Sequence, residues 1–382
     1  MMNKNKVSEI AFFLTVPLFL IYQYLISLKS IPPFFGGYLG IVYPLVFSMV
    51  FFAYLLFELP NKTKFKKLNL LVLSLFSYMV FVFIHGYAYG ASTEIVKGHI
   101  AGVIYSALFF IVFSRLNVNG RFFKKALFFS FITIVLMFFY SFDLKKMAVS
   151  YLNEDYYFSY QYMAVSVFII ASLVIFHTKF IYLRFLIFII SLAVLFFNGA
   201  RTEFAYFCAF YFLYEVSISY KTLNLYAGVF VVILLALYLL FYSDVTFTNN
   251  RVLNLLENGV FSGSGGERLR MFKDALVVIE RSPLFGSYAA YQPGEYAHSI
   301  ISLWSDFGIA SFFLFLFILG ARTFIDLKNY FNGSNNNYSN FIFALSLPML
   351  PILIFAKNHD FLLLWFYLGL SVTRHHEGHA HA

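Results

Sequence analysis

The sequence is poor in charged residues and contains almost no cysteine. Only 12% of its 382 residues are Asp, Glu, Lys or Arg, against about 25% in typical soluble domains. The single cysteine, Cys208, permits no intramolecular disulfide, and no Cys-x-x-Cys pattern of a redox or zinc site occurs. These scarcities exclude an ordinary soluble domain and a fold held by internal disulfides.

Apolar residues make up 61% of the chain, with 54 Phe and 29 Tyr among them. A helix that crosses the bilayer core needs about 20 mostly apolar residues, so the chain has room for many crossings and little else. The sequence predicts an all-α polytopic membrane protein of about twelve transmembrane helices, forming a single integral membrane domain over 1–382. The expected runs are 10–28, 34–57, 69–87, 96–114, 126–142, 162–178, 183–199, 202–219, 223–242, 308–321, 338–356 and 361–373.

The formal net charge of +9 is spread over short loops between these runs, which argues against nucleic acid as a partner. With the N-terminus in the cytoplasm, 16 of the 27 Lys and Arg residues lie on the cytoplasmic side. Only six lie in outer segments other than the long loop described next. This split follows the positive-inside rule, so both termini are expected in the cytoplasm.

A large outer loop, residues 243–298, separates the ninth and tenth predicted helices. Ser264-Gly-Gly-Glu267 is a capping-box pattern that opens a helix, which Pro283 ends. At 100° per residue its apolar side chains share one face, so we expect this amphipathic helix to lie on the membrane surface. These side chains are Leu269, Phe272, Leu276 and Ile279. A second amphipathic helix is expected to begin at His298.

Arg268, Arg270 and Arg281 of the loop helix differ in direction. Arg268 lies about 60° from the centre of the apolar stripe, toward the membrane or a cavity, which favours a functional role. Arg270 and Arg281 project away from the stripe together with Asp274, so a solvated charged face is the simpler interpretation for them.

Three further residues are candidates because of their position near the outer surface. Arg201 lies between two apolar runs, where its guanidinium could bind a phosphate by two parallel bonds; the alternative is a snorkelling arginine paired with Glu203. His298 could accept a proton near neutral pH, or could simply bond a backbone carbonyl at the interface. Tyr160 belongs to a tyrosine-rich segment that could stack on sugars, although interfacial belts have the same composition.

Residues 374–382 form a His-rich tail, His375, His376, His379 and His381 among them, that resembles a metal-binding tract. It falls on the cytoplasmic side, opposite the large loop. We interpret it as incidental or artificially appended, and we expect no metal site in this protein.

Three motifs follow one another in the second half of the sequence. They are Asn198-Gly-Ala-Arg-Thr202, Glu267-Arg-Leu-Arg-Met-Phe-Lys-Asp-Ala-Leu276 followed by Ser282-Pro-Leu-Phe-Gly286, and Ala297-His-Ser-Ile-Ile-Ser-Leu-Trp-Ser-Asp-Phe-Gly-Ile309. In the same order, they resemble the Ser-Arg-Thr turn, the arginine helix with a Pro-x-x-Gly exit, and the His-Asn segment ending in Gly-Ile of the O-antigen polymerase and O-antigen ligase superfamily of membrane glycosyltransferases. Ala200 and Ser299 depart from the Ser and Asn that are usual in the family.

The resemblance implies an O-antigen polymerase of lipopolysaccharide biosynthesis at the periplasmic face of the bacterial inner membrane. It would join undecaprenyl-pyrophosphate-linked oligosaccharide repeat units, one as donor and one as acceptor, without metal or other cofactor, and a chain-length regulator protein would be a further partner. Arg201 and Arg268 would stabilise the pyrophosphate leaving group and His298 would accept or steer the acceptor proton. Arg270, Arg281 and Tyr160 would contribute to binding of pyrophosphate or glycan.

Two alternatives share part of this pattern. An O-antigen ligase, which transfers finished polysaccharide to the lipid A core, has the same motifs. A lipid-linked oligosaccharide flippase would also have about twelve helices, but we would expect two similar halves and no dominant outer loop.

Overall fold

The structure, a computed structural model, describes residues 4–34, 44–51, 67–143, 148–149, 159–218, 264–292, 295–332 and 336–377. These residues are helical apart from connecting segments and one pair of two-residue strands, β1 (Phe142–Asp143) and β2 (Ala148–Val149), which pair antiparallel. The labelled helical elements are α1 (Lys4–Phe13), the π-helical segment η1 (Leu14–Leu18), α2 (Phe19–Ser27), α4 (Lys67–Ala88), α5 (Thr93–Phe113), α6 (Arg121–Ser141), α7 (Tyr160–His177), α8 (Ile181–Phe197), α9 (Arg201–Ile218), α12 (Ser264–Arg281), α13 (Ser302–Phe331), α14 (Asn337–Phe355) and α15 (Leu362–Glu377).

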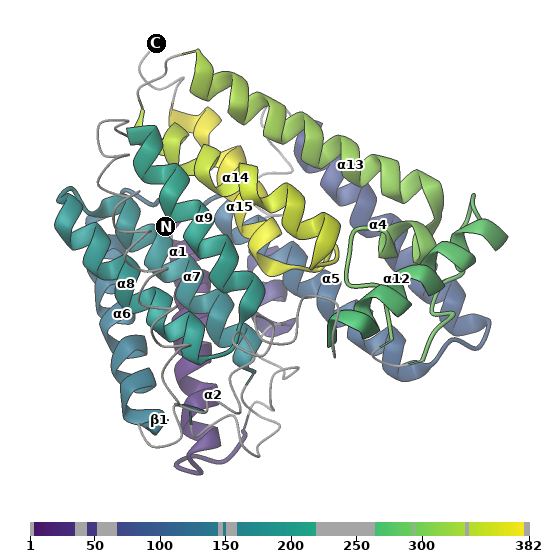
Figure 1. Cartoon of the computed structure of the whole chain (residues 1–382), viewed down its shortest axis with the longest axis horizontal. Helices are drawn as coiled ribbons and strands as arrows, with labels where there is room; N and C mark the ends of the chain where they lie inside the picture. The colour runs from purple at the N-terminus through teal and green to yellow at the C-terminus, as the bar shows by residue number, and fades with distance from the viewer. Residues whose placement is uncertain are drawn as a thin grey trace.

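Seven helices of the described chain are long and apolar enough to cross a membrane. They match seven of the twelve predicted runs. In Figure 1 these helices pack into one bundle, in which α13 runs obliquely to α2 and α6. The seven are Lys6–Ser27, Asn69–Ala88, Thr93–Phe113, Arg121–Ser141, Tyr160–His177, Ser302–Phe331 and Asn337–Phe355. The predicted helical membrane architecture is therefore confirmed at this level.

The remaining predicted runs have different outcomes. Residues 183–199 and 361–373 form the shorter apolar helices Ile181–Phe197 and Leu362–Val372, and 202–219 forms α9. The run at 223–242 lies outside the described residues, as does 243–263 of the large loop. The run at 34–57 is described only at residue 34 and over 44–51. The total of about twelve crossings and the full extent of the loop stay predictions.

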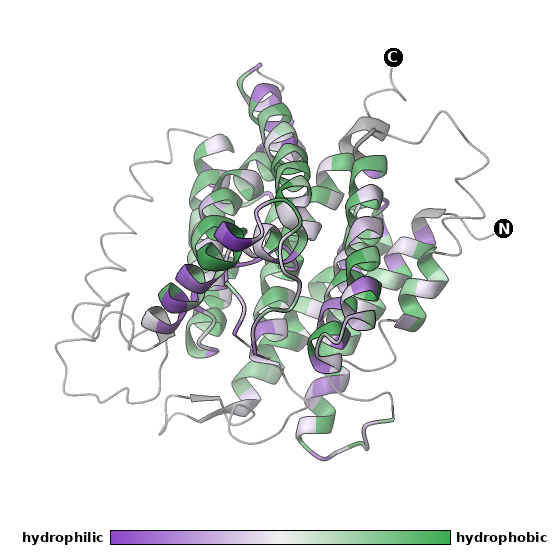
Figure 2. Cartoon of the chain, turned by 90° about the vertical axis from the view of Figure 1, so that its right-hand side faces the viewer, coloured by the Kyte–Doolittle hydropathy of each residue, from purple (hydrophilic) through white to green (hydrophobic). Residues whose placement is uncertain are grey.

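The bundle is organised around α7. Every residue of α7 from Tyr162 to Phe176 is buried, as expected for a helix that is apolar on all sides. By contrast, α6 exposes large apolar side chains such as Phe129 and Leu136. In Figure 2 the long helices are mostly green, with purple at their ends and along the short helix α12 at the front. Polar groups therefore gather at helix ends, where the candidate site must be sought.

Two glycines shape the ends of the helices that matter for the site. Gly199, with φ of 73°, ends α8; the amides of Gly199 and Ala200 donate to the carbonyls of Phe196 and Leu195. This is the Schellman pattern, which needs a left-handed residue and so favours glycine. Gly308, with φ of 79° and ψ of 177°, kinks α13.

Two predicted helix boundaries are wrong. α13 begins at Ser302, not at His298, because the amide of Ile300 donates instead to the carbonyl of Leu353 at the end of α14, at 2.8 Å. That carbonyl is one of the last four of α14, which have no partner within their own helix. α15 continues through Glu377, so the backbone of the expected tail is helical up to that residue; residues 378–382 lie outside the described residues.

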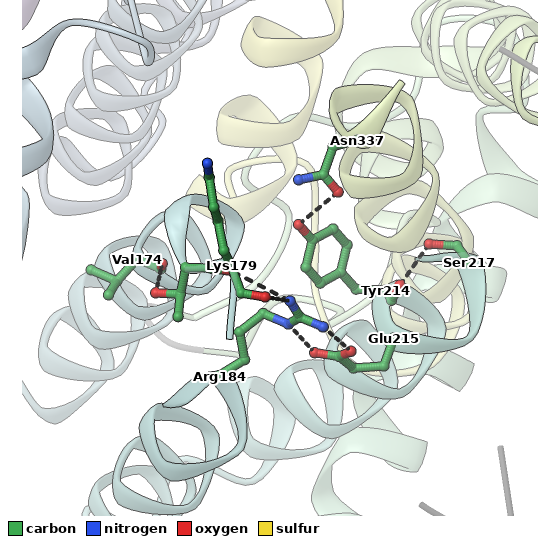
Figure 3. Close-up of polar contacts among 8 residues, drawn as sticks. Val174, Lys179, Arg184, Tyr214, Glu215, Ser217 and Asn337 are labelled. Atoms are coloured by element: carbon green, nitrogen blue, oxygen red, sulfur yellow. Dashed lines mark hydrogen bonds and ion pairs between the residues drawn. The ribbon is translucent and has the colours of Figure 1, made fainter. Parts of the chain in front are cut away.

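A buried ion pair joins α8 to α9 at the end of the hairpin away from Gly199. Arg184 donates to both carboxylate oxygens of Glu215, at 2.6 and 2.7 Å, and to the backbone carbonyls of Thr178 and Lys179. Next to it, the hydroxyl of Tyr214 donates to Asn337 of α14, at 3.1 Å (Figure 3). All these donors have partners within the bundle, so we assign this cluster to helix packing.

Candidate functional site

A polar cavity with a volume of about 130 Å³ lies where five separate segments meet. The first turns of α7, α9 and α12 contribute to it, together with residues around His298 and the connection from α14 to α15. The charged side chains that line it are Glu203, Arg268, Lys357 and Asp360, and His298 lies among them. Since a water molecule occupies about 30 Å³ in the liquid, the cavity has room for a small charged group but not for an oligosaccharide.

These five segments all fall on the outer side in the alternating topology expected from the sequence. The residues of the Arg184 cluster, Arg184, Glu215 and Asn337, fall on the opposite side in that scheme. The described structure also separates the two groups, because Glu203 and Glu215 lie near opposite ends of α9. The convergence therefore supports the relative order of crossings, while the orientation in a membrane stays a prediction.

Arg268 reaches the cavity from the exposed first turns of α12. Helix α12 is held to the bundle through its buried residues Ala275 and Ile279. Leu269 and Leu276 of the predicted apolar face remain 41% and 43% exposed, so that face is only partly buried. Their exposure leaves apolar side chains beside the bundle, where the sequence predicts contact with the membrane surface.

His298 lines the same cavity and is partly buried, with its ring 4.6 Å from that of Tyr296. Burial and the neighbouring cations Arg268 and Lys357 lower the pKa of His298 from 6.5 to about 4. The imidazole is therefore neutral at pH 7 and has a nitrogen able to accept a proton. The structure thus brings together two of the three predicted catalytic residues, Arg268 and His298.

Lys357 was missed by the sequence analysis. Its ammonium lies 2.8 Å from a carboxylate oxygen of Glu203 and 5.0 Å from the centre of the Phe361 ring. Asp360, also missed, completes the charged lining. The available signal was the polar sequence Lys357-Asn-His-Asp360 between two apolar runs, because charged residues at a membrane boundary merit attention.

Arg201 is the first residue of α9 and is partly buried, but it is not among the residues that line the cavity. Its turn contributes Glu203 instead. The sequence left open a pairing of Arg201 with Glu203. In the structure the carboxylate of Glu203 pairs with Lys357. The turn is placed against α7, because the side-chain amide of Asn198 donates to the carbonyl of Tyr160, at 2.7 Å.

The three residues expected to contribute to substrate binding, Arg270, Arg281 and Tyr160, also do not line the cavity. Arg270 is exposed and pairs with Glu295 at 2.8 Å and with Asp274 at 3.8 Å, in agreement with its predicted direction away from the apolar stripe. Arg281 is exposed at the end of α12. The hydroxyl of Tyr160 accepts a hydrogen bond from Gln161, whose own side chain lines the cavity.

A backbone contact between residues 284–287 and the kink of α13 fixes the exit of α12. We call it the glycine clasp. The amide of Ser287 donates to the carbonyl of Ser305 at 2.7 Å, and the amide of Ile309 donates to the carbonyl of Leu284 at 3.2 Å. A Cβ atom on Gly286 would lie 2.6 Å from the carbonyl oxygen of Ser305. The segment that contains Gly286 and the kink of α13 at Gly308 are therefore in direct contact.

A chain of hydrogen bonds lies beside the clasp and ties this loop to α5. Tyr291 donates to Asp306 of α13 at 3.1 Å, so its oxygen must accept from Nε2 of His99, 3.2 Å away. The Nδ1 of a neutral His99 then accepts from the hydroxyl of Tyr288, at 3.1 Å. Buried polar groups bonded in this way make the loop a fixed part of the bundle.

No grouping of three or more His, Cys, Asp and Glu side chains suited to a metal ion occurs in the part of the chain that the structure describes. Protein-family models and curated proteins were both compared with the chain, and neither comparison finds a match. The chemistry of the site therefore has to be argued from the cavity and from the motifs.

Proposed function

We propose that this chain is an O-antigen polymerase, which joins undecaprenyl-pyrophosphate-linked repeat units at the outer face of the bacterial inner membrane. The observation that supports this most is the meeting of Arg268 and His298 in one polar cavity at the ends of apolar helices. Both residues come from the motifs that resemble the superfamily, although 30 residues of sequence separate them.

In the proposed reaction, a hydroxyl oxygen of the acceptor sugar attacks the anomeric carbon of the donor. The bond from that carbon to the pyrophosphate oxygen breaks, and negative charge builds on the leaving group. Arg268 stabilises this charge, a contribution that typically amounts to about 10²–10³ in rate for one well-placed donor. His298 accepts the hydroxyl proton as the new glycosidic bond forms.

The low pKa of His298 fits this order of events. The imidazole by itself is a weak base, because burial and two cations disfavour its charged form. A bound pyrophosphate would offset those cations and raise the pKa of His298 toward its ordinary value. The donor would therefore activate the base that the acceptor needs.

The test compares Arg268→Ala and His298→Ala with Arg270→Ala. The first two should abolish long polysaccharide, whereas Arg270→Ala should have a smaller effect, because an exposed ion pair contributes at most about 1 kcal/mol. Polysaccharide length is resolved by gel, and membrane insertion of each variant is checked by immunoblotting of membranes.

Purified protein with lipid-linked repeat units, and with lipid A core added in parallel, then identifies the reaction. Products longer by whole repeat units support the polymerase, and transfer to the core instead would assign the chain as a ligase. Wild-type chain lengths in both Arg268→Ala and His298→Ala would overturn the proposed site.

A further inference from the structure

Two cationic side chains line the cavity, and only that of Arg268 has a role in the proposed reaction. The two are Arg268 and Lys357, and both lie close enough to His298 to lower its pKa. Lys357 follows the end of α14, where its amide donates to the carbonyl of Ile352 at 3.0 Å. Its backbone is therefore fixed by a membrane-spanning helix.

The ammonium of Lys357 has N–H donors that its contacts within the described residues do not use. Among the described residues its recorded partners are Glu203, at 2.8 Å, and the face of the Phe361 ring, 5.0 Å from its centre. An ammonium carries three N–H donors, and a ring face satisfies a cation without consuming a strong acceptor. The side chain is 17% exposed, while Glu203 is only 3% exposed, so the open side of the pair belongs to Lys357.

We propose that Lys357 binds the diphosphate of the lipid-linked substrate together with Arg268, and that Glu203 positions Lys357 before the substrate binds. This inference rests on the proposed function and names the ligand class of its site: a diphosphate monoester or diester of a polyprenol, in preference to a monophosphate. Two cationic side chains that line one small cavity and both act on His298 can each bind one of two adjacent phosphate groups, whereas a single phosphate offers charge for only one of them.

A diphosphate site and a purely structural ion pair predict different effects when one of the two charges is removed. If the pair serves folding alone, removing either charge damages the protein in the same way, since a buried partner is left uncompensated. If Lys357 binds an anion, removing its charge weakens binding, while neutralising Glu203 removes a competing negative charge and strengthens binding. The two substitutions then act in opposite directions.

The experiment measures the binding of farnesyl diphosphate and farnesyl monophosphate to the detergent-purified full chain, by titration calorimetry. Lys357→Gln should weaken diphosphate binding by about 10- to 100-fold, as expected for loss of a hydrogen bond to a charged group, and should reduce the preference over the monophosphate. Glu203→Gln should strengthen diphosphate binding by up to about tenfold. Lys328→Gln, a matched change of charge at the far end of α13, should leave both affinities unchanged.

The outcomes separate this inference from the function on which it rests. Wild-type protein that binds neither lipid, together with inactivity on lipid-linked repeat units, would overturn the proposed function. If the wild type binds the diphosphate and Arg268→Gln weakens this binding but Lys357→Gln does not, only the role of Lys357 is overturned. Equal loss of binding and of monodispersity in Lys357→Gln and Glu203→Gln would also overturn it, in favour of a structural ion pair. Opposite shifts in two monodisperse variants support it.

Discussion

Gly308→Ala is the substitution that should most directly uncouple the loop carrying Arg268 from the bundle. Gly308 has φ of 79° and ψ of 177°, a conformation that is essentially restricted to glycine. A Cβ atom there would lie 2.2 Å from the carbonyl oxygen of Leu284 and 2.7 Å from the carbonyl carbon of Phe285. Because both contacts are with backbone, no side-chain rotation can relieve them, and the glycine clasp must open.

The cost can be worked from these contacts. A non-glycine residue held in such a region costs about 1–3 kcal/mol, and loss of the hydrogen bond from Ile309 to Leu284 adds about 1 kcal/mol. The total is about 2–4 kcal/mol, and the one other hydrogen bond of the clasp, from Ser287 to Ser305, contributes only about 1 kcal/mol against it. We therefore expect the exit of α12 to separate from α13, and Arg268 to leave its position opposite His298.

The assay is polymer formation by purified protein on lipid-linked repeat units, with thermal unfolding of the same sample in detergent. Gly308→Ala should lose polymer formation while the rest of the bundle still unfolds cooperatively. Gly320→Ala is the matched control, because a Cβ at this site on the same helix would contact nothing within 4 Å. Wild-type product lengths and an unchanged unfolding temperature in Gly308→Ala would show that the clasp does not hold Arg268 in place.

Two further predictions concern charge. Burial, Arg268 and Lys357 lower the pKa of His298 to about 4, so the imidazole is neutral above that pH. We expect kcat/KM to stay constant down to about pH 5 and to fall only at lower pH. Lys357→Gln should move the pH of this fall upward. A fall near pH 6.5 in the wild type would contradict the described environment. Arg184→Met should destabilise the fold by about 3–5 kcal/mol, because the buried carboxylate of Glu215 loses its partner. Arg184→Met combined with Glu215→Met should recover much of that loss in thermal unfolding; if the single and double variants unfold alike, the pair is not coupled.

The existence of the helices could be predicted from apolar run length alone, since each crossing is a local property of the sequence. Burial within the bundle could not. α6 and α7 have similar apolar content, yet α7 is enclosed and α6 exposes Phe129 and Leu136. Hydropathy measures the preference for an apolar medium, and neighbouring helices and lipid satisfy that preference equally well.

The direction of Arg268 could be predicted because one helical period relates it to the residues around it. Lys357 could not be found in this way, because its role depends on segments more than 150 residues earlier in the chain, those that carry Gln161 and Glu203. The start of α13 was misplaced for a similar reason. Ile300 has a helical pattern around it, but its amide bonds to Leu353 of another helix, a competing partner that no local pattern reveals.

The cavity combines two parts of different origin, and this division constrains any mechanism. Glu203 lies in the first turn of α9 and Lys357 follows the end of α14. These two helices pack against each other within the bundle, so helix packing sets the positions of both residues. Arg268 and His298 belong to the loop that the glycine clasp and the Tyr291 hydrogen bonds hold against α13. The distance between the two cations is therefore set by the joint between loop and bundle. A diphosphate bound by both cations would therefore bridge the loop and the bundle, which the glycine clasp already holds together.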